Sequence, residues 1–200
     1  ANGTVAIGLE AARDLTSGQG NTAIGHQAFK VGTEVDYNTV IGYQAGMDLS
    51  GSSGTQAEGN TFVGHKAGTD VITGNFNVAI GHHTLLENKT GVNNVAVGQG
   101  AMTFSTASSY NVAIGTGAGS WGCGNSHSNT FVGDSAGGIY KTVGTGWGVD
   151  GGSMGGNVLM GSYAGYYIGA GNNNTAGVTA VGITAGYYTT GSYNTFVGSK

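Results

Sequence analysis

Asn94-Val95-Ala96-Val97-Gly98-Gln99-Gly100-Ala101 is one copy of an octapeptide that recurs along the whole chain. Its pattern is Asn, then Thr or Val, an apolar residue, Ile or Val, Gly, two variable residues and Ala. Eleven copies can be aligned, and they begin at Thr4, Asn21, Asn38, Asn60, Asn77, Asn94, Asn111, Asn129, Asn157, Val178 and Asn194. A repeat at a short fixed period is the sequence signature of a solenoid, in which each repeat forms one coil.

The spacing of the octapeptides shows where the coils are extended. The Gly at position five falls at residues 8, 25, 42, 64, 81, 98, 115, 133, 161, 182 and 198, so the base period is 17. Longer spacings predict insertions near residues 47–59, 138–156 and 166–177. Because length varies only between octapeptides, we expect one repeat domain over residues 1–200, whose loops absorb the insertions.

Each octapeptide is typical of a short buried strand. Thr39-Val40-Ile41, for example, is a β-branched run that is preceded by Asn and closed by Gly. Seventeen residues are too few for two helices and their turns. The sequence therefore predicts an all-β, parallel β-solenoid of about eleven short coils, with like residues stacked about 4.8 Å apart. The rest of each coil is expected to form a second short strand or a turn.

The other invariant positions have physical explanations in such a stack. Asn at position one can hydrogen-bond along the stack or to the backbone of its own turn. Gly at position five permits a positive φ or a close approach of two backbones. Ala at position eight suits a narrow coil with little interior volume.

The strand carries apolar side chains on both faces. Positions three and four point in opposite directions, so one face fills the coil and the other needs a cover from outside. The simplest cover is the same face of identical chains around an axis. If position three faces this axis, Asp in place of Ala96 or Ala113 should prevent assembly.

NTAIGHQA at residues 21–28 and NVAIGTGA at residues 111–118 resemble the head repeats of trimeric autotransporter adhesins of the YadA type. Very similar words, NTAIGYQA among them, occur in phage tail-fibre-like proteins. The resemblance implies a left-handed parallel β-roll, a homotrimer, and an extracellular place in a cell-surface fibre or a phage tail fibre. The period of 17 exceeds that of the adhesin heads, so the tail-fibre-like branch is the better match.

Composition excludes several kinds of partner. The chain has only 6 Lys and Arg against 10 Asp and Glu, and its net charge is -4, so no basic surface for nucleic acid is expected. No apolar run approaches the roughly 18 residues of a membrane span, so we expect no membrane insertion. The single Cys123 cannot form an intramolecular disulfide. A start at Ala1, without Met or a charged leader, suggests a processed chain or an excised fragment.

Candidate catalytic residues are sparse. Glu34 with Asp36, or Asp134 with Asp150, are the carboxylates that could form an acid–base pair in a polysaccharide-degrading enzyme. Ten acidic residues along a fibre offer few such pairs, so structural or solvated carboxylates are favoured and no enzyme is expected.

Histidines recur at one position of the octapeptide. His26, His65 and His82 stand at position six, and His83 follows directly, which makes a metal or anion site conceivable. An exposed, tolerant position is favoured, because other residue types also occur there, namely Tyr43, Gln99, Thr116, Asp134 and Ser162. We therefore expect no metal and no cofactor.

Aromatic residues gather in the second half of the chain. Trp147 lies in the longest insertion, and flat aromatic faces beside neutral polar groups are typical of sugar-binding surfaces. The candidate ligand-binding residues are Trp147, Trp121, Tyr140, Asp150, Tyr166 and Tyr167. For the pairs Tyr166-Tyr167 and Tyr187-Tyr188, simple stacking between coils is favoured, because they follow their octapeptides at the same offset.

These observations favour a non-enzymatic fibre or fibre-tip module that binds a cell-surface glycan or receptor. Two alternatives remain, a passive structural spacer and a polysaccharide-degrading enzyme of the tailspike kind. A spacer is expected to have uniform repeats, whereas this chain concentrates its longest insertion and most of its aromatic residues in the second half.

Overall fold

The computed structural model describes residues 2–51, 57–120, 125–138, 154–169 and 175–199. In this part of the chain, eleven strands form one parallel sheet in sequence order, with one three-residue strand in each octapeptide. The prediction of an all-β, parallel β-solenoid is confirmed. The strands are β1 (Val5–Ile7), β2 (Thr22–Ile24), β3 (Thr39–Ile41), β4 (Thr61–Val63), β5 (Val78–Ile80), β6 (Val95–Val97), β7 (Val112–Ile114), β8 (Thr130–Val132), β9 (Val158–Met160), β10 (Thr179–Val181) and β11 (Thr195–Val197).

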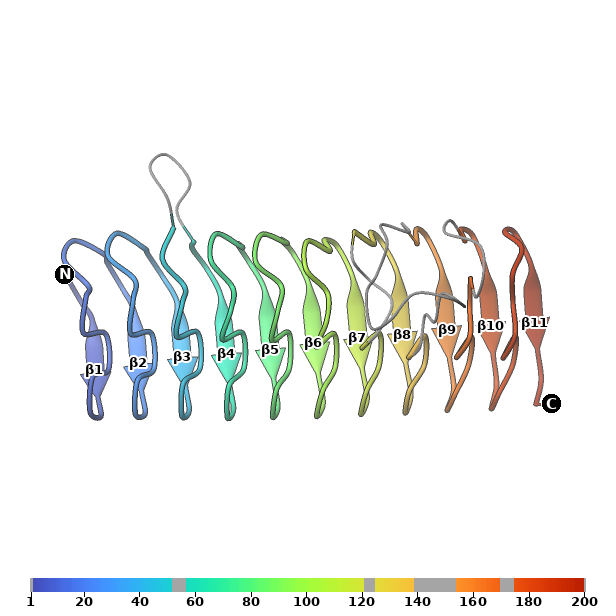
Figure 1. Cartoon of the computed structure of the whole chain (residues 1–200), viewed down its shortest axis with the longest axis horizontal. Coiled ribbons are helices and arrows are strands. Elements are labelled where there is room, and N and C mark those ends of the chain that lie inside the picture. The colour runs from blue at the N-terminus through green and yellow to red at the C-terminus, as the bar shows by residue number, and fades with distance from the viewer. Residues whose placement is uncertain (1, 52–56, 121–124, 139–153, 170–174, 200) are drawn as a thin grey trace, which may run out of the picture.

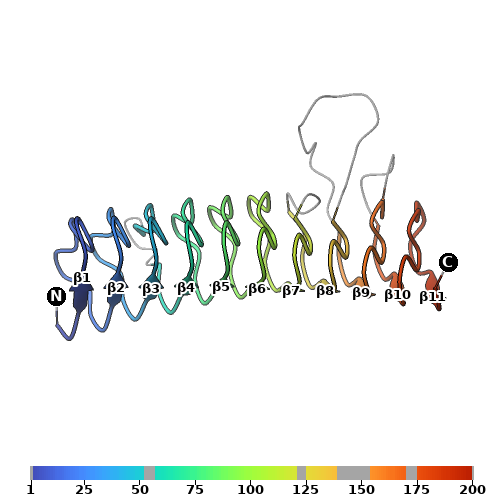
Figure 2. The same ribbon diagram turned by 90° about the horizontal axis from the view of Figure 1, so that it is seen from below.

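The molecule is a rod whose two termini lie at opposite ends (Figure 1). Figure 2, seen after a quarter turn, shows the strands along one side of the rod and the connecting turns along the other. Outside the strands, only isolated bridges occur in the described residues, so the rest of each coil is a turn and not a second strand. None of the described residues belongs to a helix that could cross a membrane.

Identical positions of the octapeptide stack on one another throughout the sheet. Ala96 pairs with Ala113 across β6 and β7, and Thr130 pairs with Val158 across β8 and β9 although 28 residues separate them. The turns are hydrogen-bonded from coil to coil as well, since the N–H of Phe29 donates to the carbonyl of Ala45 at 3.0 Å. Backbone pairing along the rod axis therefore satisfies polar groups in both halves of the coil.

The inside of the coil is filled by position three, together with position eight. Position three is fully buried from β2 to β10 within a single chain, and Ala28, Ala45 and Ala67 at position eight are buried as well. Ala96 and Ala113 therefore face the interior of their own coil, and the interpretation that they face an oligomer axis is wrong. Position three points inward whether it is Ala96, Val40 or Phe62, and positions two and four point outward.

Large and small residues alternate inside the coil so that its volume stays filled. Ala23, Ala79 and Ala96 at position three are followed, directly after the octapeptide, by the large buried residues Phe29, Leu85 and Met102. Where position three is Phe62, the residue directly after the octapeptide is Gly68, and a Cβ added there would lie 2.7 Å from the Phe62 ring. This exchange keeps the interior close-packed without widening the coil.

The Asn residues at position one form a continuous buried ladder from Asn21 to Asn157. In the middle of it, Asn94 Oδ1 accepts hydrogen bonds from the backbone N–H and from Nδ2 of Asn111, both at 3.1 Å. Asn94 Nδ2 donates to Asn77 Oδ1 at 2.9 Å and to the carbonyl of Ser108 at 2.7 Å. Asn111 Nδ2 donates both to Asn94 Oδ1 and, at 3.0 Å, to the carbonyl of Ser109 in its own turn, so both predicted bonding modes occur in one side chain.

Candidate functional site

One side of the rod, the outer face, is formed by positions two and four of successive strands. Position four is always Ile, Val or Met, and position two is Val or Thr. Ile114, in the middle of the outer face, is 42% exposed, and its neighbours in the adjacent coils, Val97 and Val132, are also apolar. The side chains at position four thus form a continuous apolar strip, and such strips are typical of interaction surfaces.

A row of exposed aromatic side chains follows one edge of this outer face. Tyr37, Phe76 and Tyr110 stand directly before the octapeptides of β3, β5 and β7, and they are 62%, 53% and 60% exposed. Their φ values of 58°, 56° and 61° lie in the left-handed region. In the same place, the coils of β2, β4, β9 and β10 have Gly20, Gly59, Gly156 and Gly177, also with positive φ. We call Tyr37, Phe76 and Tyr110 the edge aromatics.

The preceding coil holds the edge aromatics in place. A Cβ added to Gly20 would lie 2.9 Å from Cδ1 of Tyr37, and one added to Gly59 would lie 2.6 Å from Cδ1 of Phe76. One ring edge of Tyr37 and of Phe76 therefore lies over a glycine of the coil before, while more than half of each residue is exposed. Because they occupy alternate strands, these rings are spaced by two rungs, or about 9.6 Å.

Sequence reasoning missed the edge aromatics because it compared only residues inside the octapeptide. The available signal was that the residue directly before the octapeptide is Gly in five coils and Tyr or Phe in four, with Tyr193 as the fourth. That position needs a left-handed backbone, which Gly adopts freely and other residues adopt only at some cost.

The candidate pair Tyr166 and Tyr167 lies on the turn after β9. Tyr166 stacks on Tyr187 with ring centroids 5.5 Å apart, and Tyr167 stacks on Tyr188 at 4.9 Å with an interplanar angle of 2°. The expected stacking between coils is confirmed, and ligand contact by these rings stays a prediction. The other candidates, Trp147, Trp121, Tyr140 and Asp150, lie outside the described residues.

Of the candidate carboxylates, Asp36 has a structural partner. Its Oδ1 accepts a hydrogen bond from the backbone N–H of Gln19 in the preceding coil, at 2.7 Å. Asn75 and Ser109 make the same kind of bond two coils and four coils further on, to Glu58 and Val92. Asp36 thus bonds the backbone as a neutral Asn or Ser does elsewhere, while Glu34 beside it is exposed.

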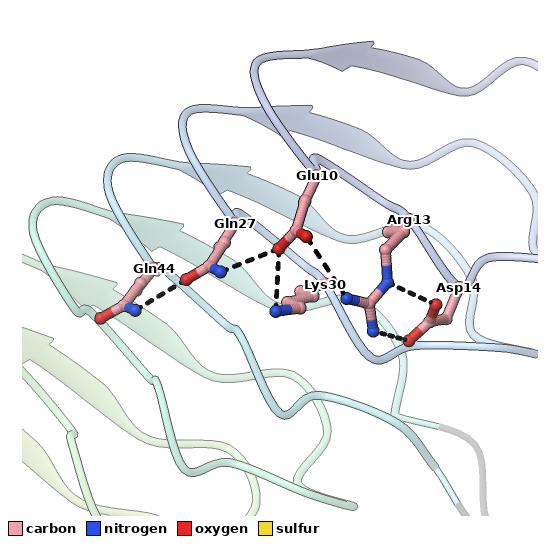
Figure 3. Close-up of polar contacts among 6 residues, drawn as sticks. All are labelled: Glu10, Arg13, Asp14, Gln27, Lys30 and Gln44. Carbon is pink, nitrogen blue, oxygen red and sulfur yellow. Dashed lines mark hydrogen bonds and ion pairs between the residues drawn. The ribbon is translucent and has the colours of Figure 1, made fainter.

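Side chains at position seven also line up along the rod, as the first coils show (Figure 3). Gln44 Nε2 donates to Gln27 Oε1, and Gln27 Nε2 donates to Glu10 Oε2, both at 2.8 Å. Lys30 Nζ forms an ion pair with Glu10 at 2.8 Å, and Arg13 is bonded to Asp14. The hydrogen bond from Lys30, followed by the one from Gln27, lowers the pKa of Glu10 to about 2.

Position six forms a parallel ladder of rings, which are exposed except for the half-buried His26. His26 stacks on Tyr43 and Tyr43 stacks on His65, each with ring centroids 5.2 Å apart, and His65 stacks on His82 at 4.8 Å. His83, at position seven of the β5 coil, leans toward this ladder, with its centroid 3.9 Å from that of His82 and 5.4 Å from that of His65. Three imidazoles thus meet on one patch of the surface.

No family model matches the chain, and neither curated proteins nor solved structures show a significant match to it.

Proposed function

We propose that this chain is a segment of an extracellular, homotrimeric fibre of left-handed β-rolls that binds an extended glycan and does not cleave it. The observation that carries this proposal is the row of edge aromatics, Tyr37, Phe76 and Tyr110, which are more than half exposed on a rigid rod. Large aromatic side chains are rarely so exposed and so regularly placed without a binding role.

A glycan is the ligand that best suits these side chains. Aromatic rings pack against the C–H faces of sugars, and neutral hydrogen-bonding groups around them complete the recognition. Charged residues make up only 8% of the chain, which favours a neutral ligand over a strongly ionic one. Rings spaced by two rungs along a straight rod can contact successive parts of one extended chain, so that weak contacts reinforce one another.

The edge aromatics can be removed without disturbing the coil. Because Gly20 and Gly59 occupy the same place with positive φ, the triple variant Tyr37→Gly, Phe76→Gly, Tyr110→Gly keeps a compatible backbone. We expect it to lose at least about tenfold in affinity for the glycan, at about 0.5–1.5 kcal/mol for each lost aromatic contact. A glycan array followed by calorimetry on the best ligand measures this loss.

A matched control removes an aromatic residue from a different surface. Tyr43→Gln places at position six the residue that Gln99 provides three coils later, so binding should be unchanged. Full binding by the triple variant would exclude the edge aromatics as the site. Wild-type protein that binds no glycan and no cell would indicate a passive spacer, and released oligosaccharides would indicate an enzyme.

The trimer is supported by the outer face. Three chains that pack positions two and four around one axis would cover the strip, and the assembly would have a mass of about 60 kDa, three times 19.8 kDa. Ile114→Asp should dissociate it, because the outer face cannot bury an unpaired carboxylate without a cost of several kcal/mol. Light scattering measures the mass, and circular dichroism checks that the coil persists.

The control for this variant carries the same charge two residues away. Thr116→Asp introduces at position six the residue that stands there as Asp134, so the trimer should remain intact. A wild-type chain that stays a folded monomer at micromolar concentration would contradict the trimer.

A further inference from the structure

We propose that His65, His82 and His83 form a binding site for one divalent transition-metal ion of the zinc type. One ring nitrogen from each of the three side chains lies within 4.8 Å of the other two. The proposed glycan-binding row uses none of these residues, so the metal site stands independently of it.

Two features of the fold bring the three rings together, namely the stacking of the coils and the left-handed backbone at His83. His65 and His82 stand at position six of successive coils, after β4 and β5, and the stacking of the coils places their rings 4.8 Å apart. His83 belongs to the next position, but its left-handed backbone, with φ of 54°, sends the side chain back beside His82. The following coil has Gly100 at position seven, so no side chain fills the space beside His83 on that side.

The distances suit a metal ion after a small movement. Tetrahedral zinc with Zn–N bonds of about 2.0–2.1 Å holds its ligand nitrogens about 3.4 Å apart. Nitrogens that now lie within 4.8 Å reach this separation by rotation of the side chains, since His65 and His82 are exposed. Three neutral imidazoles suit Zn²⁺, Cu²⁺ and Ni²⁺, and they leave a coordination position open to water or an outside ligand.

Lys66, directly after His65, places a positive charge near the cluster, so the site should be weaker than one flanked by carboxylates.

Calorimetric titration of the metal-free trimer with Zn²⁺ tests the site. We expect one Zn²⁺ for each chain and a melting temperature that rises with zinc concentration, because the metal binds the folded coil. His82→Gln and His83→Gln should each weaken binding at least about tenfold. Gln already stands at the same positions, as Gln99 for position six and Gln44 for position seven, so neither variant should unfold the coil.

His26→Gln is the matched control. It removes a histidine from the same ring ladder, but Tyr43 lies between it and the cluster, so zinc binding should be unchanged. Co²⁺ in place of Zn²⁺ gives a visible absorption spectrum that should show nitrogen ligation in the wild type and lose intensity in His82→Gln. The proposal is overturned if wild-type protein takes up no zinc, or if the cluster variants bind it as tightly as wild type.

Discussion

Gly98→Ala is expected to prevent the central coils from folding. The φ of Gly98 is 125°, far from the left-handed region near +57° that other residues can adopt, so this conformation is essentially restricted to Gly. A Cβ at this position would also lie 2.6 Å from the carbonyl oxygen of Gly115 in the next coil. The neighbouring backbone cannot move away without breaking the register of the sheet. Strain and clash together should cost at least about 4 kcal/mol.

Thermal melting followed by circular dichroism measures this effect, and insoluble expression would be an equivalent result. Gly100→Ala is the control, two residues away. Gly100 has a φ of 67°, which Gln44 and His83 adopt at the same position of their coils, and its added Cβ would meet only Thr103 Oγ1 at 3.4 Å. It should cost about 1 kcal/mol. Similar melting temperatures for the two variants would show that the glycine contact is unimportant.

Asn94→Ala should produce the second large loss of stability. The Asn94 side chain is fully buried, donates two hydrogen bonds and accepts two. Without it, the buried backbone N–H of Asn111 loses the side-chain oxygen to which it donates, and a cavity remains in the turn. An unsatisfied buried donor and the lost bonds should together cost about 3 kcal/mol. Denaturant unfolding gives the free energy of unfolding directly.

Asn194→Ala provides the comparison at the end of the ladder. Asn194 Nδ2 donates only to carbonyls of its own turn, those of Gly191 and Ser192, and its side-chain oxygen is not part of the buried ladder. Its removal should cost about 1 kcal/mol or less. An equal effect of the two variants would mean that the ladder adds nothing beyond the local turn.

The strands, their register and the roles of Asn and Gly were predictable because every octapeptide repeats the same local chemistry. A strand such as Val95–Val97 pairs in a single register, because both neighbouring strands belong to the same octapeptide pattern. The repeat did not predict which of the two faces of the strand lies inside the coil. Both faces are apolar, and alternation identifies opposite faces without saying which lies inside. Packing across the whole coil decides it, since position three is buried whether it is Ala96, Val40 or Phe62, and position four lies outside.

The edge aromatics and the histidine cluster depend on turns that the periodicity does not describe. Tyr37 and His83 both have a left-handed backbone, which redirects their side chains relative to neighbouring residues. Sequence alignment placed His65 and His82 on one ladder but gave no reason for His83 to approach it. A contact between adjacent residues on a turn follows from dihedral angles, and these cannot be read from a pattern of residue types.

The direction of the hydrogen bonds determines how the rod responds to tension. Because the strands lie across the rod, the hydrogen bonds between them point along it. A pull on the two ends therefore loads only a few of these hydrogen bonds at a time. Val5 pairs with Thr22, 17 residues later, so each coil that opens adds about 55 Å of extended chain. Coils that open one by one at modest force would let an anchored fibre lengthen under flow before its attachment fails.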